Sequence, residues 1–237
     1  MSFGDLRPAL RAATAAAGGI AGYPLPSTAL VFAPSRRLFR VQAEIADPAA
    51  VALTFDDGPH PEGTPRVLEL LRAANAQATF FLVGEQVERF PELAREIVDA
   101  GHEVAVHCFR HVNLMRRGPA TTRDDLDRAA ATIGEATSAE LRHYRPPYGI
   151  LTLPALRHAR ARGWQTVLWR HDGRDWRADA TPESIAARLL GKASGGEVLL
   201  LHDADWYASP RSWERTAGAL ELVLERLRER GLRARSL

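Results

Sequence analysis

Two adjacent carboxylates are the first residues in this chain whose types and placement could do chemistry. Asp56 and Asp57 directly follow the apolar run 51–55, and Gly58 and Pro59 come next. The run predicts a short buried strand, and the turn after it would hold both carboxylates in place. One carboxylate could bind a metal ion while the other takes a proton. The alternative is a turn that only ends the strand, since these residue types dominate turns.

Two histidines could complete a metal site with one of these carboxylates. His107 and His111 are four residues apart, and on a helical turn this spacing puts both imidazoles on one side. With Asp57 they would form a site with three protein ligands and open positions for water, which is the layout of catalytic zinc. Cys108 follows His107, so the pair is not a His-Glu-x-x-His protease motif. Alone, the pair fits two structural or solvated histidines equally well.

Three further charged residues stand at or shortly after the ends of apolar runs: Arg145, Asp175 and His202. Considered singly, Arg145 fits a salt bridge at a strand end and Asp175 fits a plain turn. His202 is different, because a histidine that closes a buried strand needs a polar partner.

The elements that would position these residues alternate between strand and helix at intervals of about 30 residues, a pattern typical of βαβ units. The predicted strands are 51–55, 78–83, 102–106, 141–145, 164–169, 197–201 and 232–237. Helices are predicted after Thr64-Pro65, from Pro91, over 121–136 and 153–161, after Thr181-Pro182, and over 213–230. The threonines are the expected caps, and the aspartates early in 121–136 suit the helix dipole.

This alternation predicts an α/β fold, a deformed (β/α) barrel of about seven parallel strands. An open doubly wound sheet is the alternative. In a parallel barrel the carboxyl ends of the strands share one face, where active sites are built. The candidate residues all stand at or just beyond such ends, so we expect them to converge there.

The composition excludes several classes of function. The chain has 237 residues, of which 46% are hydrophobic and 25% charged, an ordinary balance for a globular protein. Its net charge of +2 gives no case for a nucleic-acid partner. Neither a P-loop nor a Gly-x-Gly-x-x-Gly fingerprint is present, so we expect no nucleotide cofactor. Cys108 is the single cysteine, which rules out an intramolecular disulfide. We expect a monomer.

Residues 1–48 are predicted to form an arm ahead of one domain that spans 49–237. Arg7 and Arg11 precede the alanine-rich stretch 12–17. The favoured interpretation is a short helix and an extended segment packed on the domain. The alternative is a degenerate signal or a weakly membrane-associated segment. The sequence has no unbroken run of about 18 apolar residues, so we expect no transmembrane helix. Without a clear signal peptide, the cell envelope and the cytoplasm both stay open as locations.

Five motifs occur in order along the chain: Thr54-Phe-Asp-Asp-Gly-Pro59, His107-x-x-x-His111, Arg145-Pro-Pro-Tyr-Gly149, Asp172-x-x-Asp-Trp176 and Leu200-x-His202. Together they resemble the motifs of the polysaccharide deacetylases. These are metal-dependent carbohydrate esterases that remove N-acetyl groups from chitin or peptidoglycan sugars. The resemblance covers about Val51 to the C-terminus and also implies a deformed (β/α) barrel.

The resemblance implies a metal and two proton-transferring groups. Asp57, His107 and His111 would hold a divalent metal, zinc in the first place, with cobalt, manganese and nickel as alternatives. Asp56 would be the general base for an attacking water, whose pKa the metal would lower while polarising the amide carbonyl. His202 would be the general acid that protonates the leaving amine.

The resemblance also implies supporting roles. Asp175 would pair with the general acid and keep it charged, and Arg145 would orient the general base by a charge-assisted contact. The backbone N–H of Tyr148 would complete an oxyanion hole with the metal. Trp176 and Leu200 would wall a small pocket for the acetyl methyl group.

Some residues near the motifs depart from the family pattern or add to it. The family usually has Ser or Thr where this chain has Cys108, and a thiol would tie down the metal loop more weakly than a hydroxyl. Trp206 and Tyr207 could stack on sugar rings or pack against the protein, whereas Trp213 is expected in the core. Residues 170–171 are expected in a solvated loop.

The sequence therefore predicts a metal-dependent hydrolase that removes N-acetyl groups from N-acetylhexosamine units of a glycan. A second hypothesis keeps the fold and makes the chain a deformylase or amidohydrolase of a small or lipid-linked amide. A third is a non-catalytic glycan-binding module, against which the complete set of candidate residues argues.

Overall fold

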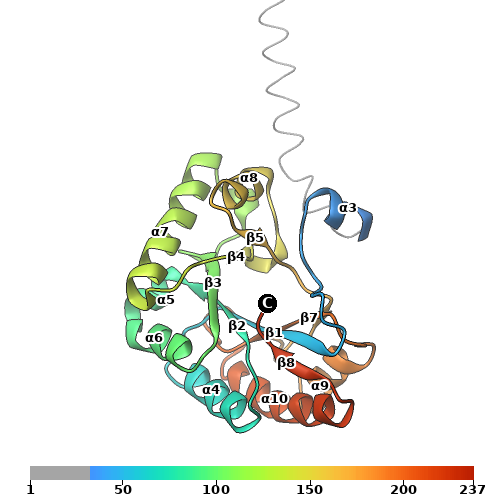
Figure 1. Cartoon of the computed structure of the whole chain (residues 1–237). Helices are drawn as coiled ribbons and strands as arrows, with labels where there is room; N and C mark the ends of the chain where they lie inside the picture. Colours follow the sequence, from blue (N-terminus) through green and yellow to red (C-terminus); the bar gives the residue numbers. More distant parts are fainter. Residues whose placement is uncertain (1–32) are drawn as a thin grey trace, which may run out of the picture.

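The computed structural model describes residues 33–237, and eight strands within them form one parallel sheet that curls into an incomplete barrel (Figure 1). The strands are β1 (Ala50–Asp56), β2 (Thr79–Val83), β3 (Glu103–Cys108), β4 (His143–Tyr144), β5 (Gln165–Thr166), β6 (His171–Asp172), β7 (Val198–His202) and β8 (Arg233–Arg235). Their order is β5-β4-β3-β2-β1-β7-β6, with β8 paired to β1. The strands run outward from β1 in chain order on one side, which confirms the deformed barrel and not the doubly wound sheet.

The segment just before β1 contacts both sides of the sheet, near β5 and near β7. Gln42 forms a parallel bridge with Val167 beyond β5, and Glu44 forms an antiparallel bridge with Glu197 before β7. The last part of the predicted arm is therefore extended and packed on the barrel, after the short helix α3 (Ala33–Leu38). The prediction for residues 1–32 lies outside the described residues.

The helices lie outside the curled sheet (Figure 1). They are α4 (Gly63–Ala73), α5 (Gly84–Arg89), α6 (Pro91–Asp99), α7 (Pro119–Thr137), α8 (Leu153–Ala161), α9 (Pro182–Leu190) and α10 (Ser212–Glu229), with short 3-10 turns η1 (Leu114–Arg116) and η2 (Pro147–Gly149). The predicted cap at α9 is confirmed: the side chains of Thr181 and Ser184 each accept from the other's backbone N–H, a capping box. Among the described residues, no helix is long and apolar enough to cross a membrane.

The prediction that Thr64 caps a helix is wrong. Helix α4 begins one residue earlier, and its N-cap residue, Glu62, makes no side-chain cap bond. Thr64 is fully buried; its hydroxyl accepts from the His60 N–H at 2.8 Å and donates to Asp203. Its position is therefore fixed by contacts with the site-bearing loops and not by the helix end.

The aspartates near the start of α7 do not serve the helix dipole. The helix begins at Pro119, with no acidic residue in its first turn. Asp125 lies further along and binds the preceding loop instead. Its side chain accepts from the backbone N–H groups of Phe109 and Arg110, which follow β3, and this explains its position better than the dipole does.

Several predicted strands are shorter than expected, and two elements were missed. Only two residues of 141–145 and two of 164–169 pair as strands: β4 pairs with β3 at a single position, and β5 is the edge strand beyond it. Helix α5 was not predicted because it begins at Gly84, directly after the last residue of β2, with no loop between the two elements. The solvated loop expected at residues 170–171 is confirmed for Arg170, an exposed residue in a bend that contacts Glu44 at 3.5 Å. It is wrong for His171, which begins β6 and contacts Glu197 at 3.2 Å.

The core explains why β1 is at the centre. All seven of its residues are buried, as expected for a strand of a parallel sheet covered on both faces. On one side, Phe55 stacks on Phe80 of β2 with ring centroids 5.1 Å apart. This packing fixes the carboxyl end of β1, where the two candidate aspartates stand.

Candidate active site

The register of the parallel strands brings the candidate residues together at the carboxyl ends of β1, β3, β4 and β7. Asp56 is the register partner of His202 on the neighbouring strand β7. Arg145 directly follows β4, and its backbone N–H donates to Val106 of β3, one residue before His107. Residues up to 146 positions apart, from Asp56 to His202, therefore share one small region, as the strand-end positions predicted.

Three side chains form a cluster that could hold a metal ion. Oδ1 of Asp57 lies 3.4 Å from Nε2 of His107 and 3.3 Å from Nε2 of His111. One ligand atom from each residue lies within 4.8 Å of the other two. Within the described part of the chain, Oδ1 of Asp57 is buried without any hydrogen-bond donor. A buried carboxylate oxygen facing two imidazole nitrogens fits a divalent cation.

The protonation of this cluster also suits a metal. Nδ1 of His107 lies 2.8 Å from the carbonyl oxygen of Arg145; since a carbonyl only accepts, Nδ1 carries the proton and the lone pair of Nε2 points to Asp57. Burial lowers the pKa of His111 to about 4. Burial would raise the pKa of Asp57, but the nearby histidines lower it to about 2. His111 and Asp57 are thus deprotonated near neutral pH, as metal binding requires.

Asp56 is held by a buried arginine. Nη1 of Arg145 donates to Oδ1 of Asp56 at 2.6 Å and to the Thr54 hydroxyl at 2.9 Å. The guanidinium is fully buried over the ring of Phe81, at 4.0 Å from its centroid. Oδ2 of Asp56 lies on the side of the cluster, 4.0 Å from Nε2 of His107. One oxygen of Asp56 is therefore fixed by the arginine while the other faces the candidate metal ligands.

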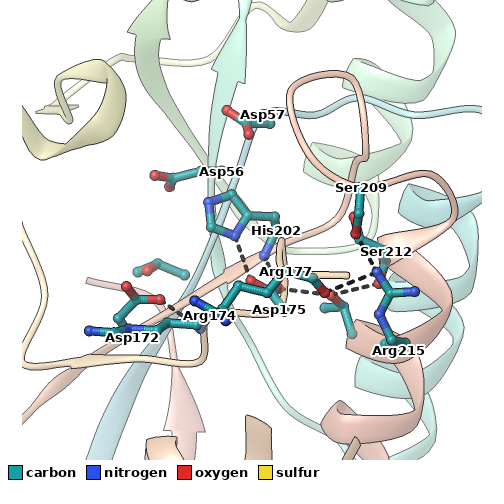
Figure 2. A network of polar contacts seen from close by, with 12 residues as sticks. Asp56, Asp57, Asp172, Arg174, Asp175, Arg177, His202, Ser209, Ser212 and Arg215 are labelled. Atoms are coloured by element: carbon teal, nitrogen blue, oxygen red, sulfur yellow. Dashed lines mark hydrogen bonds and ion pairs between the residues drawn. The ribbon is translucent and has the colours of Figure 1, made fainter. Parts of the chain in front are cut away.

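His202 is held by Asp175 (Figure 2). Oδ1 of Asp175 lies 2.7 Å from Nδ1 of His202, and Oδ2 accepts from the His202 backbone N–H at 2.7 Å. Thr216 of α10 also donates to Oδ2, at 2.7 Å. Burial would lower the pKa of His202, but Asp175 and, more weakly, Asp57 and Asp56 raise it to about 10. The imidazole lies between Asp56 and Asp57 on one side and Asp175 on the other (Figure 2).

The predicted pocket residues lie around this cluster with different exposures. Tyr148 is 57% exposed and in the left-handed conformation, with φ 58°, and its ring meets the edge of His111 at 4.5 Å between centroids. Trp176 is 42% exposed, whereas Leu200 is buried in β7. Their roles in an oxyanion hole and a methyl pocket stay predictions.

The aromatic residues after β7 pack against site residues. Tyr207 stacks on His111 with centroids 4.3 Å apart and donates its hydroxyl to Glu85 at 2.7 Å. Trp206 donates from Nε1 to the Pro59 carbonyl at 3.2 Å. Both are therefore held by the protein, whatever else they contact. Trp213 is only partly buried, so the expectation of a core position is wrong.

Sequence reasoning missed three polar residues that contact site residues or the loops that carry them. Thr216 donates to Asp175, and Asp125 accepts from the backbone of the loop before His111. Asp203 packs against Gly58, in the turn after Asp57. Asp203 is fully buried, its Oδ1 has no donor within the described residues, and burial raises its pKa to about 7. An aspartate directly after His202 could have been noticed as a buried acid, since it continues an apolar strand.

A further cavity adjoins the metal cluster. Its volume is about 680 Å³, and it is lined by His111, Val112, Asn113, Arg116, Arg117, Tyr148 and Ile150. Of the three candidate ligands, the cavity reaches His111.

Fold and site together define a partial (β/α) barrel with a candidate metal site and two ion-paired side chains at its strand ends. Comparison with known proteins agrees with this class: residues 44–167 match the family described as polysaccharide deacetylase. A chitooligosaccharide deacetylase of Bradyrhizobium sp. (strain ANU 289) is 37% identical over 84% of this chain and 94% of its own. A peptidoglycan-N-acetylglucosamine deacetylase of Bacillus cereus is 37% identical over 77% of this chain and 84% of its own.

Among solved structures, a CE4 family pseudoenzyme from Bacillus anthracis superposes with a TM-score of 0.72 and is 29% identical, covering 80% of this chain and 64% of its own. The chain belongs to the polysaccharide deacetylase family. Its relatives include both named deacetylases and a named pseudoenzyme, so the residues of the site decide which of the two this protein resembles in activity.

Proposed function

We propose that this protein is a metal-dependent hydrolase that removes N-acetyl groups from N-acetylglucosamine units of a glycan. The observation that carries the proposal is the placement of the Asp57, His107 and His111 cluster beside two ion-paired side chains. Asp56, paired with Arg145, has Oδ2 at 4.0 Å from Nε2 of His107. His202, paired with Asp175, is the register partner of Asp56 on the neighbouring strand.

The cluster would hold a divalent metal, with zinc favoured by the ligand set of two imidazoles and one carboxylate. When bound, the metal would supply Lewis acidity, which lowers the pKa of water and polarises an amide carbonyl. Cobalt, manganese or nickel could serve at the same ligands, because imidazole suits several of these ions.

Asp56 would take the proton of the attacking water. Its Oδ1 accepts from Arg145 at 2.6 Å, which orients the carboxylate and leaves Oδ2 directed at the cluster. Proton transfer by a positioned side chain contributes roughly 10²- to 10⁴-fold to rate. The arginine would thus act as a positioning residue through its charge-assisted hydrogen bond.

His202 would give a proton to the leaving amine. Its pKa, raised to about 10, keeps the imidazole protonated near neutral pH, and Asp175 fixes Nδ1 so that Nε2 carries the transferable proton. The amine that leaves is the sugar nitrogen, and the acyl group leaves as acetate.

Three further residues would contact the substrate. The N–H of Tyr148 would bind the developing oxyanion, and Trp176 with Leu200 would enclose the acetyl methyl group. The left-handed backbone of Tyr148 turns its ring toward His111, which supports a position at the rim of the site.

Two other functions are tested by the same experiment. A deformylase or small-amide hydrolase would use the same groups on another acyl chain, and a glycan-binding module would bind without turnover, as a pseudoenzyme among the relatives suggests. Purified protein is incubated with N-acetylglucosamine oligomers, peptidoglycan fragments and formylated amino sugars, and acetate and formate are measured. Acetate release supports the proposal, formate release alone supports the second function, and glycan binding with neither product supports the third.

A further inference from the structure

The loop that carries His111 is held at both ends by one buried carboxylate from another element. Oδ2 of Asp125, on α7, accepts from the backbone N–H of Phe109 at 2.8 Å. The N–H of Arg110 lies 3.2 Å from both carboxylate oxygens. At the far end of the loop, Nη1 of Arg117 donates to Oδ1 at 2.6 Å. Asp125 thus binds both ends of the segment 109–117.

The donors around Asp125 require a charged acceptor. Two backbone N–H groups and one guanidinium point at a side chain that is 9% exposed. A carboxylate offers two acceptor oxygens, whereas an amide offers one and would turn its own N–H groups toward these donors. Charge-assisted bonds of this kind are roughly twice as strong as neutral ones.

Phe109, the first residue after β3, is fixed by further contacts. Its ring is buried, with the guanidinium of Arg128 at 3.7 Å from its centroid. The ring also packs on Gly84, where an added Cβ would come within 2.5 Å of it. The carbonyl of Phe109 accepts from the N–H of Glu85 at 3.0 Å. With its N–H, carbonyl and ring all held, this residue sets the direction in which the chain reaches His111.

Cys108 contributes little to fixing the loop that carries His111. The thiol is buried and its pKa is raised by burial and by nearby carboxylates, Asp125 among them. A protonated thiol is only a weak donor and a weak acceptor. The strong contacts to the loop come from the carboxylate instead.

We propose that Asp125 is a positioning residue for the metal site: it fixes the segment 109–117 so that Nε2 of His111 meets Asp57 and His107. This role rests on the proposed function, because it assumes that these three residues bind the metal. Asp125 itself stays outside the ligand set and acts through the backbone of the loop.

The test is the zinc affinity of the purified metal-free protein, measured by competition with a chromophoric chelator. Loss of a group that orients a ligand typically costs about 10- to 100-fold in metal affinity, and we expect a loss in this range for Asp125→Ala. Asp125→Asn keeps one acceptor oxygen and should fall between. Arg117→Gln releases the far end of the segment but keeps both backbone bonds at the near end, and should also fall between the parent and Asp125→Ala. Asp124→Ala is the matched control, because it removes an exposed acid from the same helix.

Thermal unfolding of the metal-free variants separates positioning from general stability. A merely structural role would lower the unfolding temperature of Asp125→Ala and leave the zinc affinity of the folded protein unchanged. Parent-like zinc affinity in Asp125→Ala overturns the proposal; where that variant does not fold, parent-like affinity in Asp125→Asn does so. If the parent protein binds no zinc, both the metal site and the role of Asp125 are wrong. If the parent binds zinc and neither Asp125→Ala nor Asp125→Asn changes the affinity, only the role of Asp125 is wrong.

Discussion

Arg145 and Asp56 form a buried ion pair in which only one carboxylate oxygen is used. Nη1 of Arg145 lies 2.6 Å from Oδ1 of Asp56, and Oδ2 is left on the side of the metal cluster, 4.0 Å from His107. The arginine is fully buried, so it cannot turn away to solvent. The pair therefore presents a carboxylate oxygen at a fixed position beside the candidate ligands.

Asp56→Asn should abolish turnover while the protein still binds metal. The amide keeps an oxygen for Arg145 but cannot take a proton, and we expect a loss of at least about 10²-fold in kcat, the lower range for a general base. The measurement is acetate release together with metal content. Retained turnover would remove Asp56 as the base, and loss of metal would place it among the ligands.

Asp175→Asn should change the pH profile of the reaction. Asp175 raises the pKa of His202, so its neutralisation lowers that pKa. The acid form of His202 is lost as pH rises through its pKa, and the alkaline limb of kcat should therefore move to lower pH by about one to three units. An alkaline limb at the same pH in variant and parent would contradict the role of His202 as the acid.

Thr216→Val should shift the alkaline limb of kcat in the same direction as Asp175→Asn, but by less. It removes the hydroxyl that donates to Oδ2 of Asp175 and leaves the His202 contact in place. Without this donor the carboxylate is positioned less firmly against His202, and we expect the alkaline limb to move to lower pH by less than in Asp175→Asn. Because Thr216 is fully buried, circular dichroism should accompany the pH profile, and a larger shift than that of Asp175→Asn would count against the assignment.

Asp203 should make the protein less stable as pH rises. Its folded-state pKa is raised to about 7 from 3.8 by burial, so the folded state binds more protons than the unfolded state between these values. Stability from the neutral carboxyl is complete below about pH 4 and is lost as pH rises through about 7. Asp203→Asn should remove this pH dependence. The free energy of unfolding of the variant relative to the parent should therefore rise by about 1 kcal/mol or more between about pH 5 and about pH 8.

The free energy of unfolding in urea at the two pH values checks this prediction. The comparison is the difference between variant and parent, since other carboxylates titrate in both. An unchanged difference would show that Asp203 is ionised in the folded protein across the range.

The barrel and most of the site could be predicted because parallel topology makes strand ends meet. Apolar runs that end in Asp56, Arg145 or His202 indicate both a strand and the face on which the residue lies. Spacing then predicted the metal cluster, although His107 lies within a strand and not on a helical turn.

The residues that could not be predicted act through contacts between distant elements. Asp125 reaches the loop at Phe109 from 16 positions away, and Thr216 reaches Asp175 from 41. Neither lies at a strand end or in a motif, and each looks like an ordinary polar residue of an amphipathic helix. The same holds for Thr64, whose local sequence suits a helix cap while the partner of its hydroxyl, Asp203, is 139 positions away.

The most direct test is acetate release from N-acetylglucosamine oligomers by protein of known metal content, before and after chelation and after zinc is restored. About one zinc per chain is predicted from the single three-ligand cluster of the described residues, with acetate release that chelation abolishes and zinc recovers. Acetate release that persists in fully metal-free protein would contradict the proposed metal-dependent deacetylase.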